Sequence, residues 1–143
     1  MTKIDFYILP EQSSQSRELL ACRLAEKAYL KQHNIYIHAA SREQAATLDD
    51  LLWTFNQGSF LPHDLTVTGN KTGAPISIGY QDAPDIEYDV MINLSEEIPA
   101  FFSRFTRVAE LVDQAPTSRN LARERYRFYR DRGYSLDSHE LKA

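Results

Sequence analysis

Arginine and aromatic residues alternate in one short stretch of the chain, residues 120–134 (NLARERYRFYRDRGY). A guanidinium group binds carboxylates and phosphates through paired hydrogen bonds, and a neighbouring aromatic ring adds an apolar wall. The stretch therefore fits the carboxyl terminus of a peptide with an apolar last side chain. It also fits single-stranded nucleic acid, held by stacking and phosphate contacts. A solvated helix face without a ligand is the third interpretation.

A helical wheel separates the residues of this stretch. Four arginines share one side: Arg119, Arg123, Arg127 and Arg130. Tyr126 lies at the border of that side, whereas Arg125 and Arg132 lie on another side. The apolar arc, which we expect to face the core, holds Leu121, Ala122, Phe128 and Tyr129.

A second stretch with large apolar residues is LLWTFNQGSFLPHDL, residues 51–65. It contains the only tryptophan, Trp53, and then Phe60, Leu61 and Pro62 in a segment marked by glycine and proline. Apolar side chains in such a loop either fold back into the core or are offered to a partner. The sequence alone leaves both interpretations open.

The remaining reactive residues do not form a recognisable catalytic site. His63 is followed by Asp64, but residues adjacent in sequence rarely point at each other, and we expect a loop histidine with a local hydrogen bond. Cys22 lies on the buried stripe of a predicted helix and is expected to be a core residue. The acidic run at 82–89 lacks the glycine turn and spacing of a calcium loop, so we expect no metal.

A nucleotide site is not expected either, because the turn after the first predicted strand, LPEQSSQS, has no glycine to approach a phosphate. No cofactor is predicted, and an enzyme acting on a small molecule is the weakest of the alternatives. Detection of a bound nucleotide or metal would revive it.

Alternating strand and helix patterns position these residues. Strands are predicted at 3–9, 35–40, 75–80 and 88–94, with a further strand at 107–112 if the sheet is parallel. Helices are predicted within 13–32, at 42–55 behind the capping box Ser41-Arg42-Glu43-Gln44, and over the arginine-rich stretch. This order predicts one α/β domain over 1–143, with a mainly parallel central sheet and helices on both faces. Its topology would be Rossmann-like, without a phosphate loop.

Charge is distributed unevenly along the 143 residues, whose net charge is −4. Residues 117–132 hold six arginines against Glu124 and Asp131, a local charge of +4, so the rest of the chain carries −8. A protein that neutralises many phosphates is usually basic, and broad nucleic-acid binding is therefore not expected. One cysteine, no apparent signal peptide and no apolar run long enough to span a membrane favour a reducing cytoplasm.

Several segments together resemble the chi subunit of the bacterial DNA polymerase III holoenzyme, in the same order along almost the whole chain. They are FYIL in the first strand, LLWTFNQGSFLPHDL, TGAPISI, DVMINL, and LARERYRFYR followed by Gly-Tyr. The resemblance implies a single α/β domain, similar to a mononucleotide-binding fold without nucleotide, and no catalysis of its own.

Chi subunits pair with the small psi subunit of the clamp-loader complex, and with a repair helicase at an overlapping surface. They also bind the acidic tail of single-stranded-DNA-binding protein, which ends in proline and a phenylalanine carboxylate. Contact with DNA is then mostly indirect. The resemblance implies that Trp53 and Phe60, with Leu61 and Pro62 beside them, face psi. The tail site is implied at four residues: Val112, Arg123, Tyr126 and Arg127. Residues 113–120 depart from the family pattern.

Overall fold

Parallel strands and three helices make up the part of the chain that the computed structural model describes, namely residues 2–11, 13, 15–56, 58, 60–65, 74–81, 83–84 and 88–142. The elements follow in this order: β1 (Lys3–Ile8), α1 (Arg17–Leu30), β2 (Ile35–His38), α2 (Arg42–Thr54), β3 (His63–Leu65), β4 (Ile76–Gly79), β5 (Val90–Asn93), the 3-10 helix η2 (Phe102–Arg104), β6 (Arg107–Val112), α3 (Pro116–Asp131) and β7 (Ser135–Glu140).

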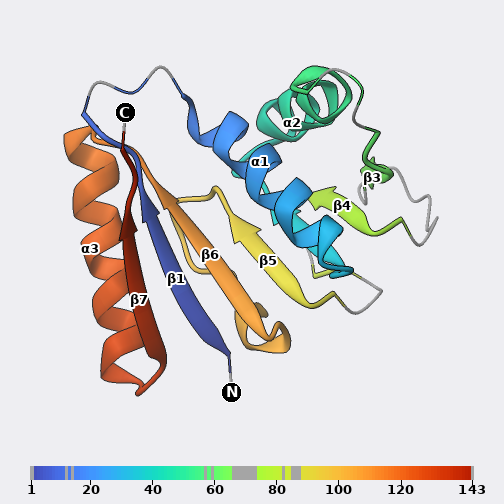
Figure 1. Ribbon diagram of the computed structural model, residues 1–143. Helices are drawn as coiled ribbons and strands as arrows, with labels where there is room; N and C mark the ends of the chain where they lie inside the picture. Colours follow the sequence, from blue (N-terminus) through green and yellow to red (C-terminus); the bar gives the residue numbers. More distant parts are fainter. Residues whose placement is uncertain are drawn as a thin grey trace.

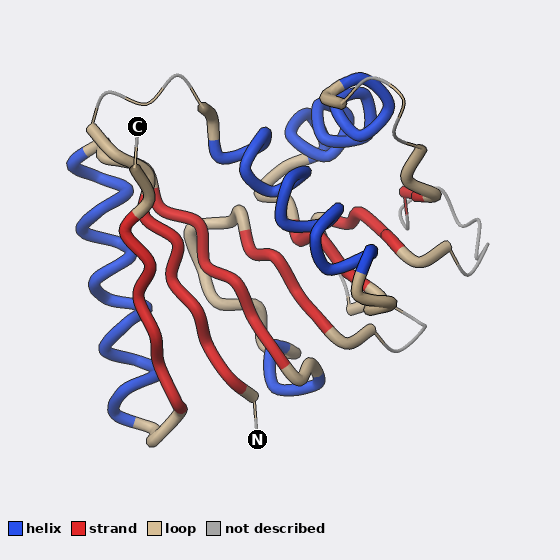
Figure 2. Tube along the Cα trace, in the orientation of Figure 1, coloured by secondary structure: helices blue, strands red, loops and turns tan. Residues whose placement is uncertain are grey.

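The sheet has seven strands in the order β3-β4-β2-β5-β6-β1-β7, and every neighbouring pair is parallel. Helices α1 and α2 cover one face, and α3 covers the opposite face over β6, β1 and β7 (Figure 1, Figure 2). The predicted α/β class, the parallel sheet and the helices on both faces are confirmed. The 107–112 segment is a strand, as a parallel sheet requires.

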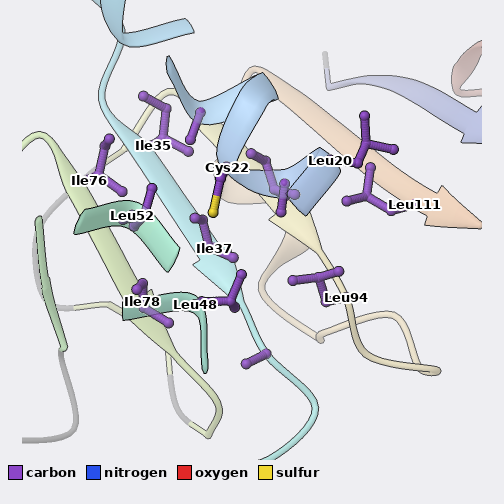
Figure 3. Packing of buried hydrophobic residues seen from close by; sticks show 14 of the residues in the cluster. Leu20, Cys22, Ile35, Ile37, Leu48, Leu52, Ile76, Ile78, Leu94 and Leu111 are labelled. Carbon is purple, nitrogen blue, oxygen red and sulfur yellow. The ribbon is translucent and has the colours of Figure 1, made fainter. Parts of the chain in front are cut away.

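The core consists of two apolar layers, one on each side of the sheet. Under α1 and α2, branched residues of β2 and β4 meet leucines of the helices, and Cys22 lies among them (Figure 3). On the other face the layer is aromatic, with Phe6, Tyr36 and Tyr129 among its members. A central strand buried on both faces needs apolar residues at successive positions, which explains why all four residues of β2 are buried.

Local signals fix where the helices begin. Ser16 caps α1 by accepting a hydrogen bond from the Leu19 N–H at 3.1 Å. Ser41 caps α2 by accepting from the Gln44 N–H at 3.1 Å, and the Gln44 side chain reaches back to the Ala40 N–H at 2.7 Å. The predicted capping box is therefore confirmed, although the glutamine bonds one residue before the cap. Pro116 occupies the first turn of α3, where its missing N–H costs nothing.

Two strands were not predicted. β7 has the sequence SLDSHE, which carries only one aliphatic residue, and β3 is three residues long inside a predicted loop. β7 is held by pairing with β1 and by polar contacts, including Lys3 Nζ to Asp137 Oδ2 at 2.7 Å. No helix among the described residues is long and apolar enough to cross a membrane.

Candidate functional site

A cavity of about 220 Å³ lies between α3 and the carboxyl ends of β1, β6 and β7. Its apolar floor comes from the sheet and from the buried side of the helix: Phe6, Ile8, Val112 and Ala122. Its rim is polar: Gln114, Arg119, Arg123, Tyr126, Ser138 and Glu140. Ligands of open parallel sheets commonly bind beyond the carboxyl ends of the strands, and the cavity has this position. We call it the α3 cavity.

Three of the four residues named for the peptide-tail site line the α3 cavity together. Val112 ends β6, while Arg123 and Tyr126 project from α3. The ring of Tyr126 lies 5.4 Å from that of Phe6 at an interplanar angle of 59°, and Tyr126 remains partly exposed. Arg127 is exposed on α3 but does not line the cavity.

Sequence reasoning missed the wall that β7 supplies, Ser138 and Glu140, because β7 itself was not predicted. Gln114 and Arg119 come from the 113–120 segment that departs from the family pattern, and both line the rim. The wheel indicated that Arg119 faces outward with the other arginines, but no sequence signal pointed to Gln114.

The arginines near the cavity have no carboxylate partner among the described residues. Among the described residues, Arg123 makes one long contact, from its Nη1 to Asn120 Oδ1 at 3.5 Å, and neither Arg119 nor Arg127 has an ion pair. Other arginines of the same chain are paired: Arg17 with Asp113, Arg107 with Asp5, Arg125 with Glu110, and Arg130 with Asp131. The cavity rim therefore offers guanidinium groups whose charge no described acidic side chain neutralises.

Arg125, whose burial was not predicted, lies on another side of α3 than Arg123, Arg127 and Arg130, as the wheel indicated. It is 6% exposed and lies under α3, where its Nε donates to Glu110 Oε1 at 3.0 Å. The buried members of α3 are Ala122, Arg125 and Tyr129, so Ala122 and Tyr129 face the core as predicted. Leu121 and Phe128 are only partly buried. Arginine is rarely buried without a partner, and the partner of Arg125, Glu110, lies on a different element, β6.

A second surface is formed by Trp53 at the end of α2 and Phe60 in the following loop. The two side chains are 51% and 66% exposed, and their rings lie 5.4 Å apart. Leu61 differs from them, since it is 1% exposed and belongs to the core under α2, so its side chain is not available to a partner in this conformation. Pro62 is partly buried. Both interpretations of this loop therefore hold, each for a different residue: Phe60 is exposed to a partner, and Leu61 folds back into the core.

His63 holds this surface in place. Its side chain is fully buried, its Nδ1 lies 2.6 Å from the Leu61 carbonyl oxygen, and its ring lies 4.4 Å from that of Trp53. Its Nε2 lies 3.1 Å from Asp49 Oδ1, without the alignment of a hydrogen bond. The predicted local contact is present, although His63 is the first residue of β3 and not part of a loop, and its ring packs against that of Trp53.

A second cavity, of about 760 Å³, lies at the carboxyl ends of β2, β4 and β5 and includes His38, Tyr80 and Phe101 in its lining. His38 Nδ1 lies 3.1 Å from the Tyr36 hydroxyl, and burial lowers the pKa of its imidazole to about 4. Arg17 is the cation of the lining, against Glu96 and Glu97. This charge balance does not favour a phosphate.

The other expectations can be placed briefly. Cys22 is fully buried, and burial raises the pKa of its thiol to about 12, with Glu18 adding to the effect. Asp82, Asp85 and Glu87 lie outside the described residues, whereas Asp89 accepts from the Asn34 N–H at 2.9 Å. Within the described part of the chain, no group of three or more His, Cys, Asp or Glu side chains is placed to hold a metal ion.

Comparison with known proteins identifies the family. The family model described as "DNA polymerase III chi subunit, HolC" matches residues 1–137. The DNA polymerase III subunit chi of Pseudomonas aeruginosa is 42% identical over 141 residues, covering 99% of this chain and 98% of that protein. The subunit of the same name from Escherichia coli is 31% identical over 143 residues, covering 96% and 97%.

A likeness to solved structures concerns the fold alone. The crystal structure of T4 UvsW matches with a TM-score of 0.65 at 11% identity, over 98% of this chain but only 41% of that one. The family assignment rests instead on the sequence matches, which extend over nearly the whole chain and nearly the whole of each relative. On that evidence, this chain belongs to the chi subunit family of DNA polymerase III, accessory subunits of DNA replication.

Proposed function

We propose that this protein is a non-catalytic adaptor that binds the acidic carboxyl-terminal tail of single-stranded-DNA-binding protein in the α3 cavity and the psi subunit at the Trp53–Phe60 surface. The first half rests on one observation: an apolar cavity whose rim carries arginines without acidic partners among the described residues. An adaptor of this kind links the polymerase complex to coated single-stranded DNA.

The size of the α3 cavity supports a single apolar side chain as its occupant. An engineered protein cavity of about 150 Å³ holds a benzene molecule. The α3 cavity, at about 220 Å³, therefore has room for one phenyl ring against Val112 and Phe6. A terminal carboxylate attached to the same residue would lie within reach of the rim, where Arg119 and Arg123 provide donors.

Charge favours a peptide over bare nucleic acid. The chain carries −4 overall, and Glu140 lines the same cavity as Arg119 and Arg123. A strand of phosphates passing over α3 would meet this carboxylate, whereas a single chain terminus needs only the arginine side of the rim. Direct binding of single-stranded DNA is therefore expected to be weak, and an oligonucleotide titration without partner protein tests that alternative.

The decisive experiment titrates the purified protein with a synthetic acidic peptide that ends in Pro-Phe, and with the same peptide amidated at its carboxyl terminus. We expect amidation to weaken binding about tenfold or more, because a charge-assisted hydrogen bond contributes roughly 1.5–3 kcal/mol. Arg123→Ala should weaken binding of the peptide with a free carboxyl terminus to a similar degree, so that this variant binds both peptides with the same affinity. Equal affinity of both peptides for the wild type would refute a carboxylate site.

Arg132→Ala is the matched control, at the residue that caps the carboxyl end of α3. Arg132 lies over the Phe128 ring at 3.6 Å and donates from its Nη1 to the Phe128 carbonyl oxygen, away from the cavity. Removing it changes the net charge by the same amount as Arg123→Ala. A similar loss of affinity in both variants would point to diffuse attraction in place of a defined site.

The second half of the proposal rests on the exposure of Trp53 and Phe60. Aromatic residues of this size on a surface are typical centres of protein interfaces. Trp53→Ala should abolish pairing with psi, measured by gel filtration of a mixture, and leave the affinity for the tail peptide unchanged. Loss of peptide binding in the same variant would show that the substitution damages the fold and would remove this support.

A further inference from the structure

A buried ion pair lies under the middle of α3. Glu110 on β6 is fully buried, and its two oxygens accept hydrogen bonds from Arg125 Nε at 3.0 Å and the Tyr129 hydroxyl at 2.6 Å. Asn93 Nδ2 donates to both oxygens, at 3.0 and 3.1 Å. Arg125 also donates from its Nη1 to the Glu96 carbonyl oxygen at 3.0 Å. Every hydrogen bond in this group that involves α3 depends on where the helix stands along the sheet.

Such a pair is not an efficient way to stabilise a protein. Taking both charges out of water costs much of what their attraction returns, and well-packed apolar residues in their place are often as stable or more so. Directional contacts have a different benefit, since they are satisfied in one arrangement only. The Glu110–Arg125 pair is therefore better explained by the position in which it holds α3 than by a contribution to the free energy of unfolding.

The other sheet-facing contacts of α3 are less selective. Ala122, the partly buried Phe128 and the ring of Tyr129, as distinct from its hydroxyl, contribute apolar surface, and apolar burial is non-directional. Sliding the helix by one turn, about 5.4 Å, would exchange one apolar contact for another. The same movement would take Arg125 away from Glu110 and leave two buried charges unpaired.

Each member of the pair lies within two residues of one side of the α3 cavity. Arg125 stands between Arg123 and Tyr126 on the helix, and Glu110 precedes Val112 on β6. The distance between the two sides of the cavity is therefore set almost directly by this pair. An error in the helix position would displace the guanidinium of Arg123 from the apolar floor at Val112.

We propose that Glu110 and Arg125 are positioning residues that fix the rotation and the axial position of α3, so that Arg123 and Tyr126 face Val112 across the cavity. The consequence for binding rests on the peptide site proposed above. The helix position itself does not, because it can be measured without any ligand.

The test replaces Glu110 and its two partners on α3 together, with Glu110→Leu, Arg125→Met and Tyr129→Phe in one variant, while Asn93 Nδ2 keeps its hydrogen bond to the Glu97 carbonyl oxygen at 3.0 Å. Two readouts are needed. NMR contacts between the rings of Tyr126 and Phe6, which lie 5.4 Å apart, report the position of α3. Titration with the Pro-Phe peptide reports the cavity. We expect a folded protein at least as resistant to urea as the wild type, with the Tyr126–Phe6 contact weakened or lost and the affinity reduced on the order of tenfold.

Arg125→Lys provides a second variant that keeps the buried charge. A lysine cannot reproduce the forked contact to Glu110 and the Glu96 carbonyl oxygen, so we expect a smaller shift of the ring contact and a smaller loss of affinity. Arg132→Met is the control, because Arg132 is the exposed cation that caps α3, and its hydrogen bond to a described residue goes to the Phe128 carbonyl oxygen and not to the sheet. It should change neither readout.

The outcomes separate the two proposals. A wild-type Tyr126–Phe6 contact in both variants would overturn the positioning role, whatever the affinity. If the ring contact shifts in the triple variant but the wild-type protein does not bind the peptide, the positioning role of Glu110 and Arg125 is supported and the proposed peptide site is refuted. If the contact shifts and the affinity remains that of the wild type, the inference that this pair shapes the site is refuted.

Discussion

His38 should make this protein less stable in mild acid. In the folded chain the imidazole is buried at the end of β2, against the Phe101 ring, with its Nδ1 facing the Tyr36 hydroxyl. Burial lowers its pKa from 6.5 to about 4. Above pH 6.5 the side chain is neutral in both the folded and the unfolded state, so it has no effect on the pH dependence there.

Below pH 6.5 the unfolded chain binds a proton that the folded chain refuses, and stability falls as the pH falls. The loss continues until the folded-state pKa, at about 4, is reached. Each pKa unit corresponds to about 1.4 kcal/mol, so the whole interval is worth roughly 3 kcal/mol of unfolding free energy. That is a large fraction of the 5–15 kcal/mol that typically stabilises a domain, on the order of a third.

Urea unfolding of the wild type and of His38→Gln, measured at several values between pH 4 and pH 7, tests this reasoning. Glutamine retains a side-chain acceptor for the Tyr36 hydroxyl but does not titrate. The difference in stability between the two proteins should change by about 3 kcal/mol across the interval, with the wild type losing more toward acid. Parallel pH profiles would refute the assignment of the buried neutral histidine, whatever offset separates the two curves.

Three further predictions concern stability and accessibility at Phe60 and Leu61, at Arg125, and at Cys22. Phe60→Ala should change the unfolding free energy by less than about 0.5 kcal/mol, and Leu61→Ala should lower it by about 2–5 kcal/mol, because only the second leaves a core cavity. Similar values for both variants in thermal melts would contradict an exposed Phe60 beside a buried Leu61. Arg125→Met alone should lower stability by about 3–5 kcal/mol, since it leaves the buried Glu110 unpaired, and an unchanged urea midpoint would contradict this. The Cys22 thiol, whose pKa burial raises to about 12, should react with a thiol reagent at neutral pH only as fast as the protein unfolds. Labelling that is complete before any unfolding would show that Cys22 is accessible.

Much of the fold follows from patterns that need no distant partner. The alternating strand and helix signals, the capping box at Ser41, and the absence of a glycine-rich turn are local properties of the sequence. They predict a parallel sheet between helices, and the structure has one. β7 escaped prediction because its sequence is polar: an edge strand with one partner needs little apolar surface, and its stability comes from β1.

The candidate sites show the same limit. The sequence pattern predicts a group of arginines beside Tyr126 on one side of the last helix, and the family resemblance singles out Arg123 and Tyr126 within it. The ion pair of Arg125 could not be predicted, because its partner Glu110 is 15 residues away on another element. The position of Glu140 at the cavity could not be predicted either, because it depends on the pairing of β7 with β1. Pairings between distant segments decide which polar side chains are buried, and no local pattern encodes them.

The order of strands has a consequence for how the chain is made. β1 is synthesised first, yet both of its neighbours in the sheet come from the last third of the sequence, with Lys3 paired to Arg107 and to Ser135. At roughly 5–20 residues per second, translation leaves this apolar strand without its partners for several seconds. The half of the sheet that carries the α3 cavity therefore closes last. Chains cut before β6 should expose β1 to chaperones and aggregation, and those cut before β7 should lack one wall of the cavity.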